Sequence, residues 1–170
     1  KWDGAGVKNL HAMFGEAATF NADLSKWVVS SATNMDSMLG EALLFNADLS
    51  KWDVSSVTKM VSMFYNATSF DGDLSKWDVS SVTGTRYMFY YARSFNCDIS
   101  KWDVSSVTDM FQMFRGAKSF KQELCGAAWV ESKANKANMF AASPGSISQV
   151  LCTSTTTQGT TQYTSRRPAT

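Results

Sequence analysis

The sequence predicts an α/β solenoid, in which one short parallel β-strand and one helical segment repeat every 25 residues. Two columns of residues carry this prediction, because both recur at that step. The tryptophans are Trp2, Trp27, Trp52, Trp77 and Trp102, and the phenylalanines are Phe20, Phe45, Phe70, Phe95 and Phe120. A fixed period of this size is typical of one supersecondary unit stacked on copies of itself. Stacked units form long, regular surfaces, which favours binding or assembly over catalysis.

The segment around each tryptophan has the alternation of a β-strand. In the coil that begins at Ile99, the apolar residues Trp102 and Val104 alternate with the polar residues Lys101 and Asp103. We expect these strands to lie side by side as a parallel sheet, spaced by about 4.8 Å, with the apolar side inward. The exposed columns of this sheet form a candidate binding face: Lys51, Asp53, Lys76, Asp78, Lys101 and Asp103.

The segment after each strand has the spacing of a helix. From Val107 to Phe120, the apolar residues follow one another as on one face of a helix of about three turns. The preceding Ser-Ser-Val-Thr segment supplies hydroxyl groups that can cap the start of a helix. In the turn that leads to the next strand, Asn96 and Asp98 follow Phe95, and both residue types favour turns.

A longer motif, Asp-Leu-Ser-Lys-Trp-Asp-Val-Ser-Ser-Val-Thr-x-Met-x-x-Met-Phe-x-x-Ala-x-Ser-Phe, stands at residues 48–70 and again, with one methionine replaced, at residues 73–95. It resembles the repeats of the BspA-like leucine-rich-repeat surface proteins, first grouped as a domain of unknown function in mycoplasma lipoproteins. The resemblance covers residues 1 to about 125. Residues 124–152 look like the end of such arrays in proteins of unicellular algae and related protists. The resemblance implies a surface-exposed or secreted protein used in adhesion or interaction, and it transfers no catalytic residue.

Two departures from the leucine-rich-repeat plan stand out. The asparagine that ties adjacent coils in that plan is replaced here by valine (Val57, Val82 and Val107), so we expect another column to supply the tether. The residues of that column are Asp23, Asp48, Asp73 and Asp98. Residues 84–87 also break the repeat. We attribute this break to drift, with a local partner surface around Tyr87, Tyr90 and Tyr91 as the alternative.

The chain divides into three parts. Residues 1–125 form a five-coil repeat solenoid, residues 126–152 a degenerate C-terminal cap, and residues 153–170 a Thr/Ser-rich extended tail. The cap keeps echoes of a coil, since Trp129 follows Trp102 by 27 residues. Because Lys1 opens in the middle of a repeat, we expect further sequence upstream.

The cysteines indicate the compartment. Cys125 and Cys152 bracket the region where the repeat breaks down, and we expect a disulfide between them. Such a bond favours an oxidising, extracellular setting. The alternative is two buried thiols. Cys97 occupies a position that other coils fill with alanine or glycine, and it is either free or paired with Cys125.

Two kinds of glycosylation site fit a secreted protein. Asn66-Ala67-Thr68 is an N-glycosylation sequon in an expected surface turn, with Asn66 as the acceptor. The tail has the composition of an O-glycosylated stalk. Its candidate acceptors are Thr155, Thr156, Thr157, Thr160 and Thr161.

Charge and motif content argue against several function classes. The balance of 16 basic and 15 acidic residues gives no overall field that would attract nucleic acid. No apolar run approaches the roughly 20 residues that span a bilayer, so we expect no direct membrane insertion in this segment. His11, the sole histidine, lies at a variable repeat position, and no His/Cys cluster has metal-ligand spacing. We therefore expect no catalytic residue, cofactor or metal; the flanking lysines also make calcium on the aspartate columns an unfavoured alternative.

Two non-catalytic functions remain. The first is an extracellular or cell-surface module for adhesion, whose partners are other surface or extracellular proteins or glycans. The alternative is a structural subunit of an extracellular fibre or surface coat, whose partners are copies of itself. Ice binding is disfavoured, because the threonine column is single. The residues of that column are Thr33, Thr58, Thr83 and Thr108.

Overall fold

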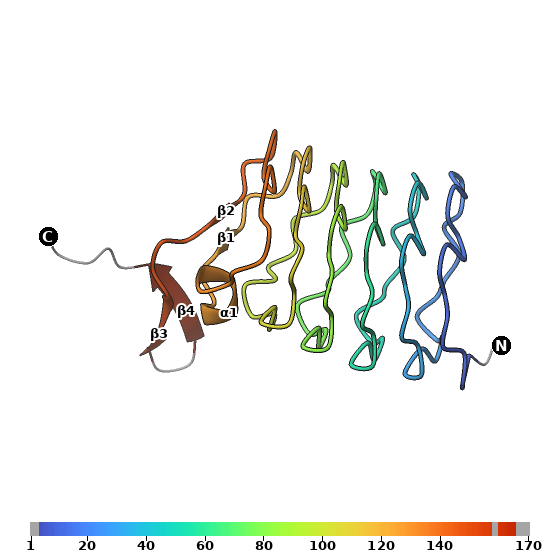
Figure 1. The fold of residues 1–170 in the computed structure, drawn as a ribbon, viewed down its shortest axis with the longest axis horizontal. Coiled ribbons are helices and arrows are strands. Elements are labelled where there is room, and N and C mark those ends of the chain that lie inside the picture. Colours follow the sequence, from blue (N-terminus) through green and yellow to red (C-terminus); the bar gives the residue numbers. More distant parts are fainter. Residues whose placement is uncertain (1–3, 158–159, 166–170) are drawn as a thin grey trace, which may run out of the picture.

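The computed structural model describes residues 4–157 and 160–165. The chain winds into successive coils that lie side by side along the longest axis of the molecule (Figure 1). One parallel β-bridge joins each coil to the next, and the bridges form a single line through the stack. This line runs through Asn9, Asn34, Lys59, Gly84, Asp109 and Asn135. The coil-to-coil step of 25 residues therefore extends into the region expected to be a cap, where the last step is 26.

The elements inside each coil differ from those expected. Residues 4–122 contain no helix and no strand longer than an isolated bridge. The segments expected to be helical consist of turns, and the bridges lie there rather than beside the tryptophans. Regular elements appear only near the C-terminal end: β1 (Glu123–Leu124), α1 (Ala127–Val130) and β2 (Ser146–Ile147), with β1 parallel to β2. The expectation of a strand and a helix in every coil was therefore wrong in detail.

Hydrogen bonding explains why the helical spacing does not produce a helix. Over residues 62–67, alternate N–H groups donate to the next coil, and the others turn back three residues within their own coil. The bonds to the next coil run from Ser62 to the Arg86 carbonyl (2.9 Å), from Phe64 to Met88 (2.9 Å) and from Asn66 to Tyr90 (2.6 Å). An α-helix needs each of these N–H groups for its own turn. Because half of them are used between coils, the segment forms a compact ladder of turns with its backbone groups satisfied.

This ladder requires an unusual backbone. Two residues of each coil, four apart, adopt the left-handed conformation, which costs a non-glycine residue about 1–2 kcal/mol. In the three inner coils these are Ser37, Glu41, Ser62, Asn66, Tyr87 and Tyr91, with φ between 53° and 61°. Only one equivalent position carries glycine, Gly116, with φ of 72°. The cost is offset by the bonds that the ladder makes to the next coil.

The core consists of stacked columns of aromatic and aliphatic side chains. Trp52, Trp77 and Trp102 are at most 4% exposed, and the rings of Trp52 and Trp77 lie parallel with centroids 6.4 Å apart. The phenylalanine column stacks at 5.8–6.1 Å from Phe45 to Phe120. Trp27 is only partly buried, and Trp2 lies outside the described residues.

Two columns tie adjacent coils together, and neither is the expected aspartate column. Each buried tryptophan donates its indole N–H to a leucine carbonyl of the preceding coil, as Trp77 does to Leu49 at 3.0 Å. A second column accepts the amide N–H of the residue 25 positions later; its members are Asn21, Asn46, Asp71 and Asn96. The expected tether residues instead accept the amide of the serine two residues on in their own coil, as Asp48 does from Ser50. The hypothesis of an aspartate tether was therefore wrong.

The C-terminal region closes the last face of the stack. Trp129 is fully buried and donates its indole N–H to the Ile99 carbonyl at 3.1 Å, so it takes the place of a repeat tryptophan. Beyond it, β3 (Cys152–Thr157) pairs antiparallel with β4 (Thr160–Ser165). The expected extended tail is thus a hairpin over its described part (Figure 1). The candidate O-glycosylation threonines lie in these strands, but their side chains and residues 158–159 and 166–170 lie outside the described part.

Candidate functional surface

The six residues of the candidate binding face are all exposed. Along the chain they alternate with core residues: Lys76 and Asp78 are exposed, whereas Trp77 and Val79 are at most 4% exposed. Lys51 with Asp53 and Lys101 with Asp103 repeat this arrangement one coil earlier and one coil later. The alternation follows from the buried tryptophan column and not from sheet pairing, because these residues are unpaired backbone. The face therefore presents the same two side chains on three successive coils.

The carboxylates of this face are held by serines of their own coils. Asp78 Oδ1 accepts the amide N–H of Ser80 at 3.0 Å and its hydroxyl at 2.6 Å, and Asp53 makes the same pair of bonds with Ser55. The hydrogen bond from the Ser80 hydroxyl is the main reason that the pKa of Asp78 is lowered. Each carboxylate is therefore a fixed, ionised acceptor beside a lysine.

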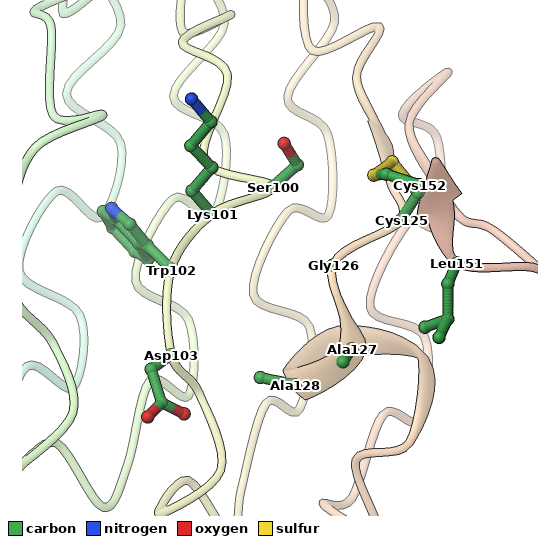
Figure 2. Close-up of a pocket in the computed structure, with 10 residues that line it drawn as sticks. All are labelled: Ser100, Lys101, Trp102, Asp103, Cys125, Gly126, Ala127, Ala128, Leu151 and Cys152. Carbon is green, nitrogen blue, oxygen red and sulfur yellow. A yellow bond between two sulfur atoms is a disulfide. The ribbon is translucent and has the colours of Figure 1, made fainter. Parts of the chain in front are cut away.

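A hollow of about 360 Å³ lies at the C-terminal end of this face, beside Lys101 and Asp103 (Figure 2). It exists because small residues stand where the repeat would place Lys-Trp-Asp. These residues are Gly126, Ala127 and Ala128, each 25 positions after its larger counterpart. A Cβ atom at residue 126 would lie 2.1 Å from the Ser100 carbonyl oxygen, so only glycine fits there. Leu151, which is 46% exposed, forms part of the wall.

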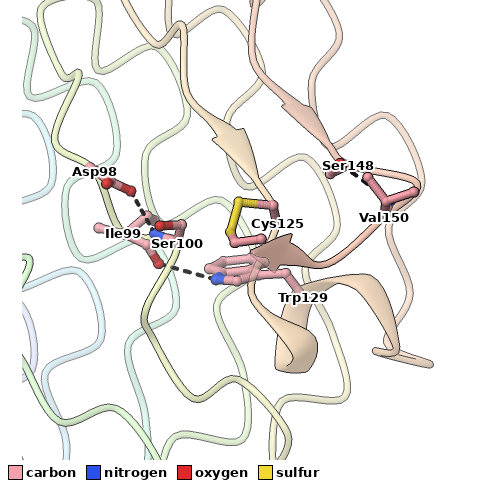
Figure 3. Close-up of a disulfide and its surroundings, with 8 residues drawn as sticks. Asp98, Ile99, Ser100, Cys125, Trp129, Ser148 and Val150 are labelled. Carbon is pink, nitrogen blue, oxygen red and sulfur yellow. Dashed lines mark hydrogen bonds between the residues drawn. A yellow bond between two sulfur atoms is a disulfide. The ribbon is translucent and has the colours of Figure 1, made fainter. Parts of the chain in front are cut away.

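The other wall of the hollow is the expected disulfide, which joins Cys125 to Cys152 with their Cα atoms 5.0 Å apart (Figure 3). The Cys152 amide also donates to the Cys125 carbonyl at 2.9 Å. The bond thus connects the start of the cap to the start of β3. Cys97 is free, and burial raises the pKa of its thiol to about 11, so little reactive thiolate forms at neutral pH.

The predicted N-glycosylation acceptor, Asn66, lies in the turn ladder with φ of 53° and is partly exposed. Its backbone N–H bonds to the Tyr90 carbonyl, and the hydroxyl of Thr68 donates to the Leu43 carbonyl at 3.1 Å. Glycan occupancy at this asparagine stays a prediction.

Catalytic and metal-binding arrangements were searched among the described residues. Over residues 4–157 and 160–165, no group of three or more histidine, cysteine, aspartate or glutamate side chains is placed to hold a metal ion. His11 is exposed, and its backbone N–H bonds to the side chain of Asn9. Within the same residues, no helix combines the length and apolar character that crossing a bilayer requires.

Sequence analysis gave little weight to an aromatic cluster that the structure brings together. Tyr65 and Tyr90 stack with centroids 4.9 Å apart, and Tyr87 meets both rings edge-on. The guanidinium of Arg86 lies between the rings of Tyr87 and Phe111, at 4.8 and 4.7 Å. The residues interpreted as drift therefore form an ordered surface feature, and the signal for it was the change from glycine to tyrosine along one repeat column.

Comparisons with known proteins identify one family. A family model described as "Mycoplasma protein of unknown function, DUF285" matches residues 1–96 and, in a second overlapping alignment, residues 45–151. Together the two alignments span the coils and the cap and stop before β3. No curated protein and no solved structure matches the chain.

Proposed function

The chain belongs to the DUF285 family, and we propose that it is a non-catalytic repeat module that binds other proteins or glycans in adhesion, at the cell surface or outside the cell. We also propose that its coils are those of a BspA-like leucine-rich-repeat solenoid, in which a ladder of turns replaces the helix. The observation that carries the functional proposal is the repeated Lys/Asp face on three successive coils.

The chemistry of this face suits a long polar ligand. Asp53 and Asp78 are held by serine bonds, so their carboxylates lose little freedom when a ligand binds. The lysines beside them supply donors on flexible stems. Because each coil repeats the same pair, an extended glycan or peptide with its own repeat can make the same contact several times, which multiplies a weak affinity.

An extracellular location is supported by two features. The Cys125–Cys152 bond belongs to an oxidising compartment. The Asn66 sequon lies in a partly exposed turn. A protein secreted from cultured eukaryotic cells is expected to carry a glycan at Asn66, visible by mass spectrometry and lost in Asn66→Gln. Failure of the folded protein to leave the cells behind its native leader would contradict the extracellular proposal.

The adhesion proposal is tested by array binding. The folded chain is expected to bind a subset of an array of glycans and extracellular-matrix proteins. Changing both Lys76 and Asp78 to Ala should weaken that binding about tenfold or more, because the central contact of the face is removed. Glu131→Ala in the cap is the matched control and should bind as the parent does. Equal binding by the parent and the double variant would exclude this face.

The alternative, a structural subunit of a fibre or coat, has one specific observation in its favour. In the inner coils, alternate N–H groups of the turn ladder donate to the next coil. In the last coil the equivalent groups have no acceptor among the described residues; they belong to Lys136, Asn138, Phe140 and Ala142. A partner edge that presents carbonyl groups could pair with them. Sedimentation over a range of concentrations separates the two proposals: growing polymers favour the subunit, and a monomer throughout excludes it.

A further inference from the structure

A slot of about 480 Å³ crosses the turn ladders of the coils nearest the N-terminal end, and none of the six residues of the Lys/Asp face lines it. It exists because one column of the repeat changes size along the stack. The residues of this column are Gly15, Gly40, Tyr65, Tyr90 and Arg115. Neither Gly15 nor Gly40 has a positive φ, so their backbone conformation does not require glycine. What the two glycines supply is an open floor, which ends where Tyr65 rises from the next coil.

The rim of the slot is acidic. Glu16 and Glu41 occupy the adjacent column and are both exposed. Among the described residues, no hydrogen bond or ion pair reaches either carboxylate. His11 is the other titratable side chain of the rim, and it is formally neutral at pH 7. The slot therefore has two unneutralised negative charges.

The end of the slot is an ordered aromatic wall. Tyr65 is fixed by stacking on Tyr90, and Tyr87 stands at 86° to Tyr65 with centroids 6.4 Å apart. The pKa of Tyr65 is raised, mainly by burial and then by its neighbours, Glu41 among them. The nearby Arg86 does not neutralise this wall, because it bonds to the Tyr87 hydroxyl at 3.1 Å and pairs with Asp109 at 3.9 Å.

From this arrangement we propose that the slot is a second binding site, which takes a lysine or arginine side chain from an extended segment of a partner protein. The apolar stem lies along the glycine floor, the cationic head pairs with Glu16 and Glu41, and the aromatic wall attracts the cation through its ring electrons. A neutral sugar could stack on the tyrosines but would leave both carboxylates unmatched, and an acidic segment would be repelled. The site deepens the proposed function by naming a partner chemistry, yet it shares no residue with the Lys/Asp face.

The test uses fluorescence anisotropy with four labelled peptides, in which glycine alternates with arginine, lysine, glutamate or serine. The folded chain is expected to bind the arginine and lysine peptides, with an affinity that falls as salt rises, and not the other two. Changing Glu16 and Glu41 together to Gln should weaken that binding about fivefold or more, since two charge pairs are lost. Equal affinity for the basic and serine peptides would overturn the proposal.

The repeat itself provides the sharpest variant, Gly40→Tyr. The next two coils carry tyrosine at this position, so the new ring should extend the Tyr65–Tyr90 stack and fill the slot without unfolding the chain. Peptide binding should be lost while the thermal melt stays at or above that of the parent. A Gly40→Tyr variant that melts like the parent and still binds the arginine peptide would overturn the proposal.

The variant with both Lys76 and Asp78 changed to Ala separates this site from the adhesion face. It should bind the arginine peptide as the parent does and lose its array ligand. Loss of peptide binding in this variant would show that the peptide contacts the Lys/Asp face, and the slot proposal would fail. Array binding that persists in Gly40→Tyr, with peptide binding unchanged as well, would remove the slot proposal and leave the adhesion proposal standing.

Discussion

At the scale of single residues, the tryptophan column combines packing and tethering in one side chain. Trp77 is 4% exposed, stacks on Trp52 and donates its indole N–H to Leu49 of the preceding coil. Its burial follows from the recurrence of tryptophan in the sequence. The indole bond does not, because a pattern of apolar residues contains no information about which carbonyl a buried N–H will reach.

Replacing Trp77 by Ala should therefore cost about 3–5 kcal/mol of unfolding free energy. The variant leaves a cavity in a continuous stack and also leaves the Leu49 carbonyl without its donor. Chemical denaturation of parent and variant measures the difference. Lys76→Ala, one residue earlier and exposed, is the control and should change stability by less than about 0.5 kcal/mol. Matching midpoints for parent and Trp77→Ala would contradict a buried tryptophan.

The left-handed residues of the ladder lead to a second prediction at this scale. Gly116 has φ of 72°, and a Cβ atom there would lie 2.9 Å from the ring of Tyr91. Gly116→Ala should therefore destabilise the fold by about 1–2 kcal/mol. Gly84→Ala is the matched control, because its φ is not positive and its added Cβ would make only an ordinary 3.6 Å contact with Val61. Equal thermal stability of the two variants would refute the strain at Gly116.

At the scale of elements, the sequence located the repeated segments but misassigned their local structure. The spacing from Val107 to Phe120 fits one face of a helix, and the structure buries that face, yet the segment is a ladder of turns. Apolar spacing reports which side chains face inward; it does not report whether an N–H group bonds within its own coil or to the next one. Glycine, the usual signal of a positive φ, is absent from most of the left-handed positions.

The same limit applies to the candidate sites. The Lys/Asp face and the Cys125–Cys152 pairing could be predicted, because both follow from position in the repeat or from where the repeat ends. The slot beside Tyr65 could not, since it arises from a change of residue size between coils at one column. Such a change looks like drift until the columns are aligned in space.

The disulfide gives the prediction that belongs to the cap as an element. It closes a loop with a sequence separation of 27 residues, which corresponds to about 3 kcal/mol in the chain-entropy account. Replacing Cys125 and Cys152 together by Ser should lower the thermal midpoint and abolish its dependence on reductant. Cys97→Ser keeps the disulfide and should retain both the midpoint and the reductant dependence of the parent. A double variant as stable as the parent would mean that the cap folds without its cross-link.

At the scale of the whole molecule, each coil bonds mainly to its two neighbours. The bridges, the indole N–H bonds and the Asn/Asp tethers all join a coil to an adjacent one. Stability in such a stack is close to a sum of coil terms and nearest-neighbour terms, so the number of coils should matter less than their phase. The same phase is what keeps the Lys/Asp face in line.

Removal of one complete period tests this view of the molecule. Deleting residues 51–75 joins Ser50 to Lys76, which restores the Ser-Lys-Trp sequence and every column of the repeat. We expect a shorter stack that still folds and buries its aromatic columns, with a lower thermal midpoint because one coil and one interface are lost. Deleting residues 51–62 removes fewer residues but breaks the phase, so tryptophans would meet turn residues of the neighbouring coil. Circular dichroism melts with gel filtration compare the two deletions. If the half-period deletion folds as well as the full-period one, stability does not depend on alignment of the columns, and a common face built on that alignment loses its physical basis.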